Sequence, residues 1–168
     1  MRIYLIGYMG CGKSTLGLKL AGELDLTFID LDKYLEERNY KTVPQIFSEF
    51  GEEGFRLRER RALEEVSEFT DVVVATGGGA PCFYDNMELM NRTGITVFLD
   101  IETSIIAERL IKSKTERPLI AGKSKAELVR FIQESLKKRK PFYEQAQLRI
   151  SKPDGALNEI IAEIRQKK

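Results

Sequence analysis

Apolar residues follow two patterns along the chain. Short apolar runs that end in glycine or acidic residues are typical of strands buried on both faces of a parallel sheet. Between these runs, apolar residues such as Leu16, Leu20 and Leu24 recur at helical spacing, which indicates amphipathic helices. The pattern predicts strands at 2–7, 27–32, 71–79, 95–100 and 147–151.

The helices expected between the strands have recognisable beginnings and ends. Thr42 and Gln45 have the spacing of a capping box, which indicates that a helix starts there. Residues 115–125, TERPLIAGKSK, show no apolar periodicity and contain proline and glycine, so we predict a mobile lid at about 112–123. No element is assigned to 80–94. The predicted helices are 13–25, 32–40, 42–50, 51–69, 101–113, 125–143 (at least as far as Pro141) and 156–168.

Alternating strands and helices predict an α/β fold with three α/β/α layers around a parallel sheet. We find no internal repeat, low-complexity segment or linker, so a single domain is expected over residues 1–168. Ligands of such sheets bind at the carboxyl ends of the strands. Here these ends carry GYMGCGKST, DLD, ATGGG and LD, which predicts one active site at this edge.

The composition of the chain excludes some kinds of partner and of catalytic group. A net charge of +1 gives no overall attraction to nucleic acid or membrane, and neither is expected as a partner. The sequence contains no histidine, which excludes a histidine base, nucleophile activator or metal ligand. Cys11 and Cys82 form neither a zinc-type spacing nor a disulfide framework. Reduced thiols, and a first apolar stretch too short for a signal peptide or membrane span, predict a cytoplasmic protein.

The run GYMGCGKST fits the phosphate-binding P-loop, with Gly7, Gly12, Lys13 and Ser14 at the required positions. Its glycines let backbone N–H groups surround phosphate oxygens, and the following helix adds a partial positive charge. Lys13 can reach the β- and γ-phosphates, and Ser14 can offer a hydroxyl to Mg²⁺. A glycine turn with a chance lysine is the alternative, which the preceding strand and following helix disfavour.

Two aspartates end the second predicted strand. Asp30 and Asp32 alternate, so both carboxylates are expected on one face. One could order Mg²⁺ through its waters, and the other could accept a proton from a substrate hydroxyl. Asp32 could also cap the next helix.

A cluster of arginines follows in FRLRERR. Arg56, Arg58, Arg60 and Arg61 cannot all face one way on a helix, and most are expected to be solvated or paired with glutamates such as Glu52 and Glu59. One arginine turned inward would suit a carboxylate, because its fork binds two oxygens.

Further candidates lie in ATGGGAP, the lid and RKPFY. Three glycines in succession let a backbone approach a ligand closely, although a tight turn is the simpler alternative. Arg117 could close over ATP from the lid. Arg139 could bind a ligand or serve as a cation at a helix C-terminus.

Six segments together resemble the shikimate kinases in order and approximate spacing, from about residue 3 to residue 150. They are GYMGCGKST, FIDLD, GFRLRE, ATGGGA, RPLI and RKPFYEQA. The resemblance implies a P-loop fold like that of nucleoside monophosphate kinases, with a five-stranded parallel sheet. It also implies transfer of the ATP γ-phosphate to the 3-hydroxyl of shikimate, in aromatic amino-acid biosynthesis.

The resemblance also implies roles for individual residues. Lys13, Asp32 and Arg117 would be catalytic, and Asp32 would hold the shikimate hydroxyls beside the reacting one. Mg²⁺ would be held by Ser14 and, through water, by Asp30. The nucleotide phosphates would be wrapped by Gly10, Cys11, Gly12, Lys13, Ser14 and Thr15, with Arg117 from the lid. Shikimate would be bound by Asp32, Arg56, Arg139, Gly77, Gly78 and Gly79.

The chain departs from the family pattern near the adenine. Many members place an arginine seven residues before the lid arginine, but position 110 is leucine and Arg109 lies one step earlier. The lid also has RPLI where many members have RPLL.

Two other functions stay open on the residues alone. One is a kinase of the same fold that acts on gluconate or a nucleoside monophosphate. The other is a P-loop binding module without activity. A monomer is expected, because no long apolar surface stripe stands out.

Overall fold

The computed structural model of the chain describes residues 1–113 and 120–167. Its five strands form one sheet in the order β2-β3-β1-β4-β5, and every adjacent pair is parallel. The strands are β1 (Arg2–Ile6), β2 (Thr27–Asp30), β3 (Val72–Ala75), β4 (Ile95–Leu99) and β5 (Leu148–Ile150). All five predicted strands are therefore confirmed.

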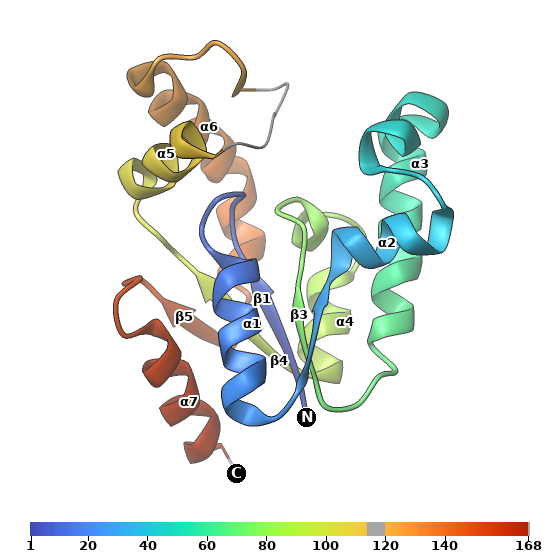
Figure 1. Cartoon of the computed structure of the whole chain (residues 1–168), viewed down its shortest axis with the longest axis vertical. Helices are drawn as coiled ribbons and strands as arrows, with labels where there is room; N and C mark the ends of the chain where they lie inside the picture. Colours follow the sequence, from blue (N-terminus) through green and yellow to red (C-terminus); the bar gives the residue numbers. More distant parts are fainter. Residues whose placement is uncertain (114–119, 168) are drawn as a thin grey trace.

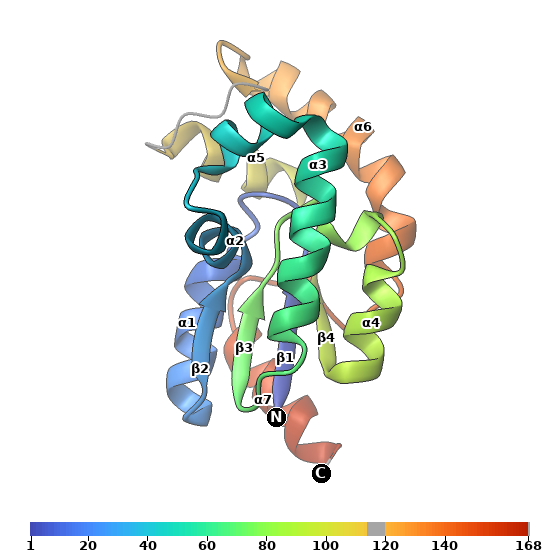
Figure 2. The ribbon, with the colours of Figure 1, turned by 90° about the vertical axis from the view of Figure 1, so that its right-hand side faces the viewer.

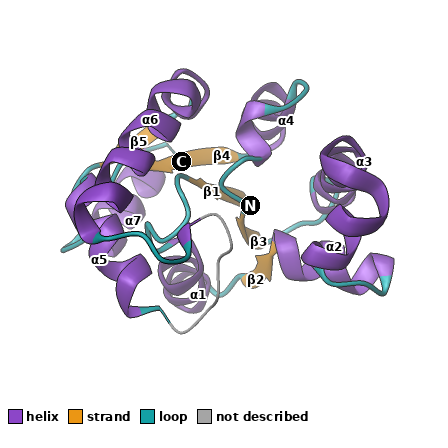
Figure 3. Cartoon of the chain, turned by 90° about the horizontal axis from the view of Figure 1, so that it is seen from above, coloured by secondary structure: helices purple, strands orange, loops and turns teal. Residues whose placement is uncertain are grey.

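Helices cover both faces of this sheet. They are α1 (Lys13–Leu24), α2 (Leu31–Asn39), α3 (Val43–Val66), α4 (Asn86–Thr93), α5 (Thr103–Lys112), α6 (Lys125–Tyr143) and α7 (Ala156–Gln166), with a short 3₁₀ turn η1 (Ala80–Cys82). Seen from above, α1, α5 and α7 lie on one side of the strands, and α3 and α4 lie on the other (Figure 3). The three-layer α/β/α prediction is confirmed.

Two hydrophobic cores lie between the sheet and the helices, one on each face of the sheet. Ile3 and Leu5 of β1 face a core shared with α1, α5, α6 and α7. Tyr4 and Ile6 face the opposite core, which α2, α3 and α4 complete. Because alternate residues of a strand point to opposite faces, the apolar run of β1 fills both cores. Figure 2 shows α3 and α4 in front of the sheet face that they cover.

Helix α4 and the turn η1 lie in the segment to which the sequence pattern assigned no element. The sequence of α4, NMELMNRT, contains asparagine and threonine, which are weak helix formers, so its local signal is small. Met87 and Met90 are buried in the core under the sheet. Tertiary packing therefore supports this helix more than its own propensity does.

Helix α3 contains a break that matches the two helices predicted at 42–50 and 51–69. Gly51 has φ 69° and ψ −176°, which is not helical. At the start, the side chain of Thr42 accepts from the N–H of Gln45, and the Gln45 side chain accepts from the N–H of Thr42. The predicted capping box is confirmed.

The carboxyl ends of the strands meet at one edge of the molecule, toward the top of Figure 1. The loop after β1 stands between two groups of helices, α2–α3 on one side and α5–α6 on the other (Figure 1). Among the described residues, none of the helices combines the length and apolar character needed to span a bilayer.

Candidate active site

The P-loop connects β1 directly to α1. Gly12 caps α1 with φ 99°, a left-handed conformation that favours glycine. The buried Lys13 folds back over the loop, where its Nζ donates to the carbonyl oxygens of Gly7 at 2.6 Å and Tyr8 at 3.0 Å. The lysine is thus held beside the backbone N–H groups that would receive phosphate.

A cavity of about 670 Å³ opens in front of this loop. It extends from the P-loop to the turn after β3 and reaches the ends of β1, β2, β3 and β4. The predicted site residues that line it are Gly10, Cys11, Gly12, Lys13, Ser14, Thr15, Asp30, Asp32, Gly77 and Gly78.

Asp30 lies between the P-loop and α2. Its Oδ1 accepts from the N–H groups of Asp32 and Lys33 and so caps α2, while its Oδ2 accepts from the hydroxyl of Ser14 at 3.2 Å. The alternative that Asp32 caps this helix is therefore wrong: Asp30 is the cap. The strand also ends at Asp30, so the placement of Asp32 at a strand end is wrong as well.

The residues present fit Mg²⁺. A hydroxyl and a carboxylate oxygen lie side by side at the mouth of the P-loop, and Mg²⁺ prefers such hard oxygen ligands together with phosphates and water. In the described part of the chain, no three Cys, Asp or Glu side chains gather as a metal cluster. A metal at Ser14 and Asp30 would therefore depend on nucleotide oxygens and water for its remaining ligands.

Asp32 occupies the first turn of α2 and faces the turn after β3. A β-carbon at Gly77 would lie 3.0 Å from Oδ1 of Asp32. Burial raises the pKa of this carboxyl, and the nearby charge of Asp30 raises it further, against the opposing effects of Lys13 and Arg56. The carboxylate is therefore more basic than an exposed aspartate.

Arg56 is the arginine of the FRLRERR cluster that turns inward. Its Nη1 donates to Oε1 of Glu59 at 2.8 Å, and its guanidinium carbon lies 4.1 Å from the centre of the Phe83 ring. A β-carbon at Gly79 would lie 2.4 Å from Nη2 of Arg56, so a larger residue there would force the guanidinium to move. Arg58 instead stacks over Phe50.

Arg139 reaches the same glycine turn from α6. A β-carbon at Gly78 would lie 3.2 Å from Nη1 of Arg139. The guanidinium carbon of Arg139 lies 5.4 Å from the centre of the Tyr8 ring, above the P-loop. Two arginines from different helices therefore flank Gly78 and Gly79, next to the cavity that contains Lys13 and Asp32.

Comparisons with known proteins identify the family of the chain. The family model described as shikimate kinase matches residues 9–167. A shikimate kinase of Phocaeicola vulgatus is 60% identical over 145 residues, which cover 86% of this chain and 83% of the relative. The chain belongs to the shikimate kinase family.

Solved structures of other shikimate kinases have the same fold. The enzyme of Bacteroides thetaiotaomicron, at 49% identity, superposes with a TM-score of 0.90 over 99% of this chain and 97% of that one. The enzyme of Acinetobacter baumannii, solved in complex with shikimate, has a TM-score of 0.83 at 36% identity, over 99% and 91%. The P-loop fold of the nucleoside-monophosphate-kinase type, predicted from the resemblance, is confirmed.

Sequence reasoning missed two residues of this shikimate kinase site. The expected pairing of Glu59 with an arginine is confirmed by its ion pair with Arg56, but the burial of Glu59, whose side chain is 1% exposed, was not expected. Its burial raises its pKa to about 7, although Arg56 opposes that shift. A β-carbon at Gly77 would lie 3.2 Å from Oε2 of Glu59, so this carboxyl stands beside Asp32. The helical spacing of Arg56 and Glu59, three positions apart, was the available signal.

The second missed residue is Tyr143, which is fully buried on α6. Its hydroxyl donates to the carbonyl oxygen of Gly78. It lies one helical turn after Arg139, so both side chains of α6 meet the same glycine turn. Its position in RKPFY gave no local indication of this contact, because the partner lies far away in sequence.

The departure from the family pattern near position 110 has a structural reason. Leu110 is buried and would lie 2.9 Å from a β-carbon at Gly10, so it packs beneath the P-loop. Arg109 instead lines the cavity, and its Nη1 donates to the carbonyl oxygen of Cys11 at 2.9 Å. Leu110 therefore packs in the interior, and Arg109 makes the polar contact at the cavity.

Arg117 and half of the predicted lid, residues 114–119, lie outside the described residues. The role of this arginine and the closing of the lid stay predictions.

Proposed function

We propose that this member of the family transfers the γ-phosphate of ATP to the 3-hydroxyl of shikimate, in the shikimate pathway. The observation that supports this most is the shared cavity, which Lys13 and Ser14 line at the P-loop and Asp32, Gly77 and Gly78 line opposite. Phosphoryl transfer depends on holding donor and acceptor in line while charge is neutralised. A single cavity with both sets of groups meets that need.

On the donor side, the P-loop would hold the ATP phosphates through its backbone N–H groups and Lys13. Binding of ATP would draw Lys13 away from the carbonyl oxygens of Gly7 and Tyr8, to which it donates here. Mg²⁺, when bound through Ser14 and Asp30, would neutralise phosphate charge. Arg117 would add a second positive charge from a lid over about 112–123.

On the acceptor side, the charges suit a small molecule that carries one carboxylate. Within the described residues, the buried Nε of Arg56 makes no hydrogen bond, and Oε1 of Glu52 lies 3.9 Å from it. A ligand carboxylate would supply that missing partner. Arg139 and the backbone at Gly78 and Gly79 would grip the same molecule.

Asp32 would accept hydrogen bonds from the shikimate hydroxyls and act as the base for the reacting one. Its raised pKa makes it a better proton acceptor than an exposed aspartate. Because the transition state of phosphoryl transfer is loose, proton removal is late and its contribution is modest, about 10²-fold in turnover. An Asp32→Asn variant with unchanged kcat at saturating shikimate would exclude this role.

One assay tests the function directly. ADP release from Mg-ATP is measured with shikimate, with gluconate, with AMP and with no acceptor. We expect stimulation by shikimate alone. AMP lacks the carboxylate that Arg56 and Arg139 would bind, whereas gluconate has a carboxylate but lacks the ring of shikimate. Stimulation by gluconate or AMP would indicate another kinase of this fold, and no stimulation by any acceptor would indicate a binding module without activity.

The remaining expectations concern the state of the protein. A cytoplasmic location is supported by the free thiols of Cys11 and Cys82, which fit a reducing compartment. A single monomeric domain over residues 1–168 is the state that we propose. Light scattering at micromolar protein concentration tests it, and a mass of twice the chain would overturn it.

A further inference from the structure

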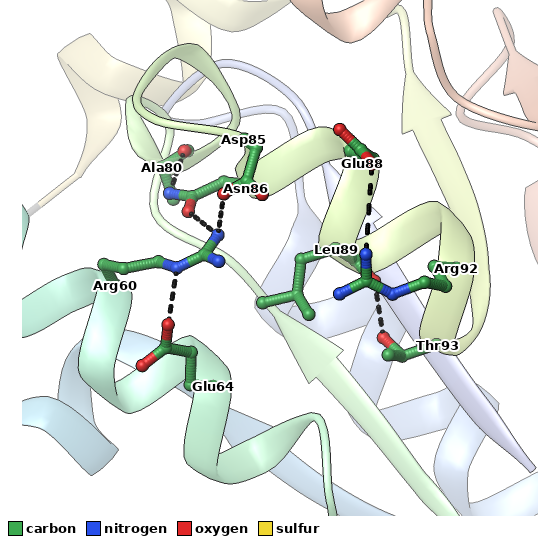
Figure 4. Close-up of polar contacts among 9 residues, drawn as sticks. All are labelled: Arg60, Glu64, Ala80, Asp85, Asn86, Glu88, Leu89, Arg92 and Thr93. Carbon is green, nitrogen blue, oxygen red and sulfur yellow. Dashed lines mark hydrogen bonds and ion pairs between the residues drawn. The ribbon is translucent and has the colours of Figure 1, made fainter.

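A polar network connects α3 to the segment that follows the glycine turn. Arg60 of α3 donates from Nη1 to Oδ1 of Asn86 at 2.8 Å, and the same nitrogen lies 2.7 Å from Oδ1 of Asp85 (Figure 4). The Nε of Arg60 donates to Oε1 of Glu64 at 2.9 Å. Three partners therefore hold this guanidinium, which is only 16% exposed.

Asn86 links Arg60 to the glycine turn through a second hydrogen bond. It is fully buried, and its Nδ2 donates to the carbonyl oxygen of Ala80 at 2.8 Å (Figure 4). Ala80 follows Gly79 directly, and its own N–H donates to the carbonyl oxygen of Gly77 at 3.1 Å. The hydrogen bonds thus run from Arg60 to the backbone that would contact the acceptor.

The same segment also touches Arg56, one helical turn before Arg60 on α3. Phe83 lies between Ala80 and Asn86 and supplies the ring on which Arg56 stacks. Arg56 also approaches Gly79 so closely that a β-carbon there would clash. The orientation of Arg56 therefore depends on where α3 holds the segment 79–86.

We propose that Arg60, acting through Asn86 and Asp85, is a positioning residue for the acceptor site: it fixes the segment 79–86 against α3 and so sets Arg56 relative to Gly79. The proposal rests on the proposed function, because that function gives Arg56 the role of binding the acceptor. Arg60 itself does not line the cavity and would not touch shikimate. It acts through hydrogen bonds to a charged group, which are stronger than neutral ones.

The test compares Arg60 with an arginine of α4 that has different contacts. Arg60→Gln removes the network, whereas Arg92→Gln removes an exposed pair on α4, in which Nη1 of Arg92 lies 3.9 Å from Glu88 (Figure 4). Kinetic constants for shikimate and ATP, and the melting temperature, are measured for each variant.

We expect Arg60→Gln to raise the KM for shikimate about tenfold, with the KM for ATP unchanged. Arg60→Lys, which keeps the charge and one contact, should recover about half of that effect on a logarithmic scale. Arg92→Gln should leave both KM values within about twofold of the wild type. A purely structural role would lower the melting temperature without separating the two substrates.

Equal KM values for shikimate in Arg60→Gln and Arg92→Gln would overturn the proposal. If Arg60→Gln does not fold, Asp85→Asn takes its place, since Asp85 is 53% exposed and its loss leaves the bond from Arg60 to Asn86. We then expect a rise of about threefold in the KM for shikimate, and no rise would overturn the proposal. A wild-type protein that shikimate does not stimulate would instead refute the proposed function.

Discussion

The two halves of the candidate site are built in different ways. The donor half is one continuous segment, from Gly7 to Thr15, and its phosphate-binding groups are mainly backbone N–H groups. The acceptor half gathers side chains from α2, α3 and α6 around a glycine turn that follows β3. A site formed by one continuous segment is specified by its local sequence. A site assembled from several elements depends on the packing of the whole fold.

The halves also differ in charge. Lys13 contacts neutral carbonyl oxygens, so an anionic phosphate can replace these partners without breaking an ion pair. Arg56 is already paired with the buried Glu59, and Asp32 lies beside that carboxyl. A carboxylate that enters the acceptor half must therefore join an existing network, which makes that half more sensitive to its surroundings.

Replacing Lys13 should give the largest effect and should break the donor half alone. We expect Lys13→Met to lower kcat about 10³-fold, because the charge aimed at the transferring phosphoryl group is lost. Kinetics at saturating ATP and shikimate measure this. The matched control is Lys19→Met on α1, an exposed residue at the outer part of the cavity lining, which should cost less than about tenfold. Similar losses of kcat in both variants would contradict the proposed role of Lys13 at the transferring phosphoryl group.

Replacing Arg139 should break the acceptor half alone. We expect Arg139→Gln to raise the KM for shikimate about 10²-fold, because the variant loses a charge-assisted contact to the carboxylate, and to leave the KM for ATP nearly unchanged. Arg130→Gln, an exposed change on the same helix, is the control and should have no effect. An equal rise in both KM values would show that the two halves are not separable at this residue.

The same contrast explains what the sequence could predict. The P-loop and its strand and helix were predicted because all their signals are adjacent, and the sheet followed from short apolar runs. The position of Asp32 was predicted wrongly, because an aspartate that ends a strand and one in the next helical turn look alike until the cap at Asp30 is seen. Contacts from Glu59 and Tyr143 depend on burial and on partners far away in sequence, and α4 depends on packing.

Because Glu59 lies in the acceptor half, a change of pH that titrates its carboxyl should alter that half alone. Its pKa of about 7 in the folded protein lies above the ordinary 4.5 because the carboxyl is buried. As the pH rises from about 6 to about 8, Glu59 ionises and adds a negative charge where shikimate brings another. We expect the KM for shikimate to rise about tenfold more over this range in the wild type than in Glu59→Gln. The KM for ATP, measured in the same series, serves as the internal control.

The same group should affect stability. A carboxyl whose folded pKa is raised binds protons more tightly in the folded state, so its contribution to stability is present below about pH 4.5 and is lost as the pH rises through about 7. Urea unfolding across this window should show a decline of up to about 3 kcal/mol in the wild type relative to Glu59→Gln. Parallel curves for the two proteins would mean that Glu59 stays ionised throughout, paired with Arg56.

The smallest effect should come from Tyr143, which tests whether the glycine turn needs support from α6. Tyr143→Phe keeps the ring that packs 5.2 Å from Phe98 and removes only the hydroxyl that donates to Gly78. The carbonyl oxygen of Gly78 then loses a hydrogen bond, which costs about 1 kcal/mol and corresponds to about a fivefold rise in the KM for shikimate if the turn shifts. Tyr40→Phe, at a side chain that is 94% exposed, is the control. If Tyr143→Phe lowers the free energy of unfolding but leaves the KM unchanged, the glycine turn is held by its own backbone and the acceptor half is more local than its scattered residues suggest.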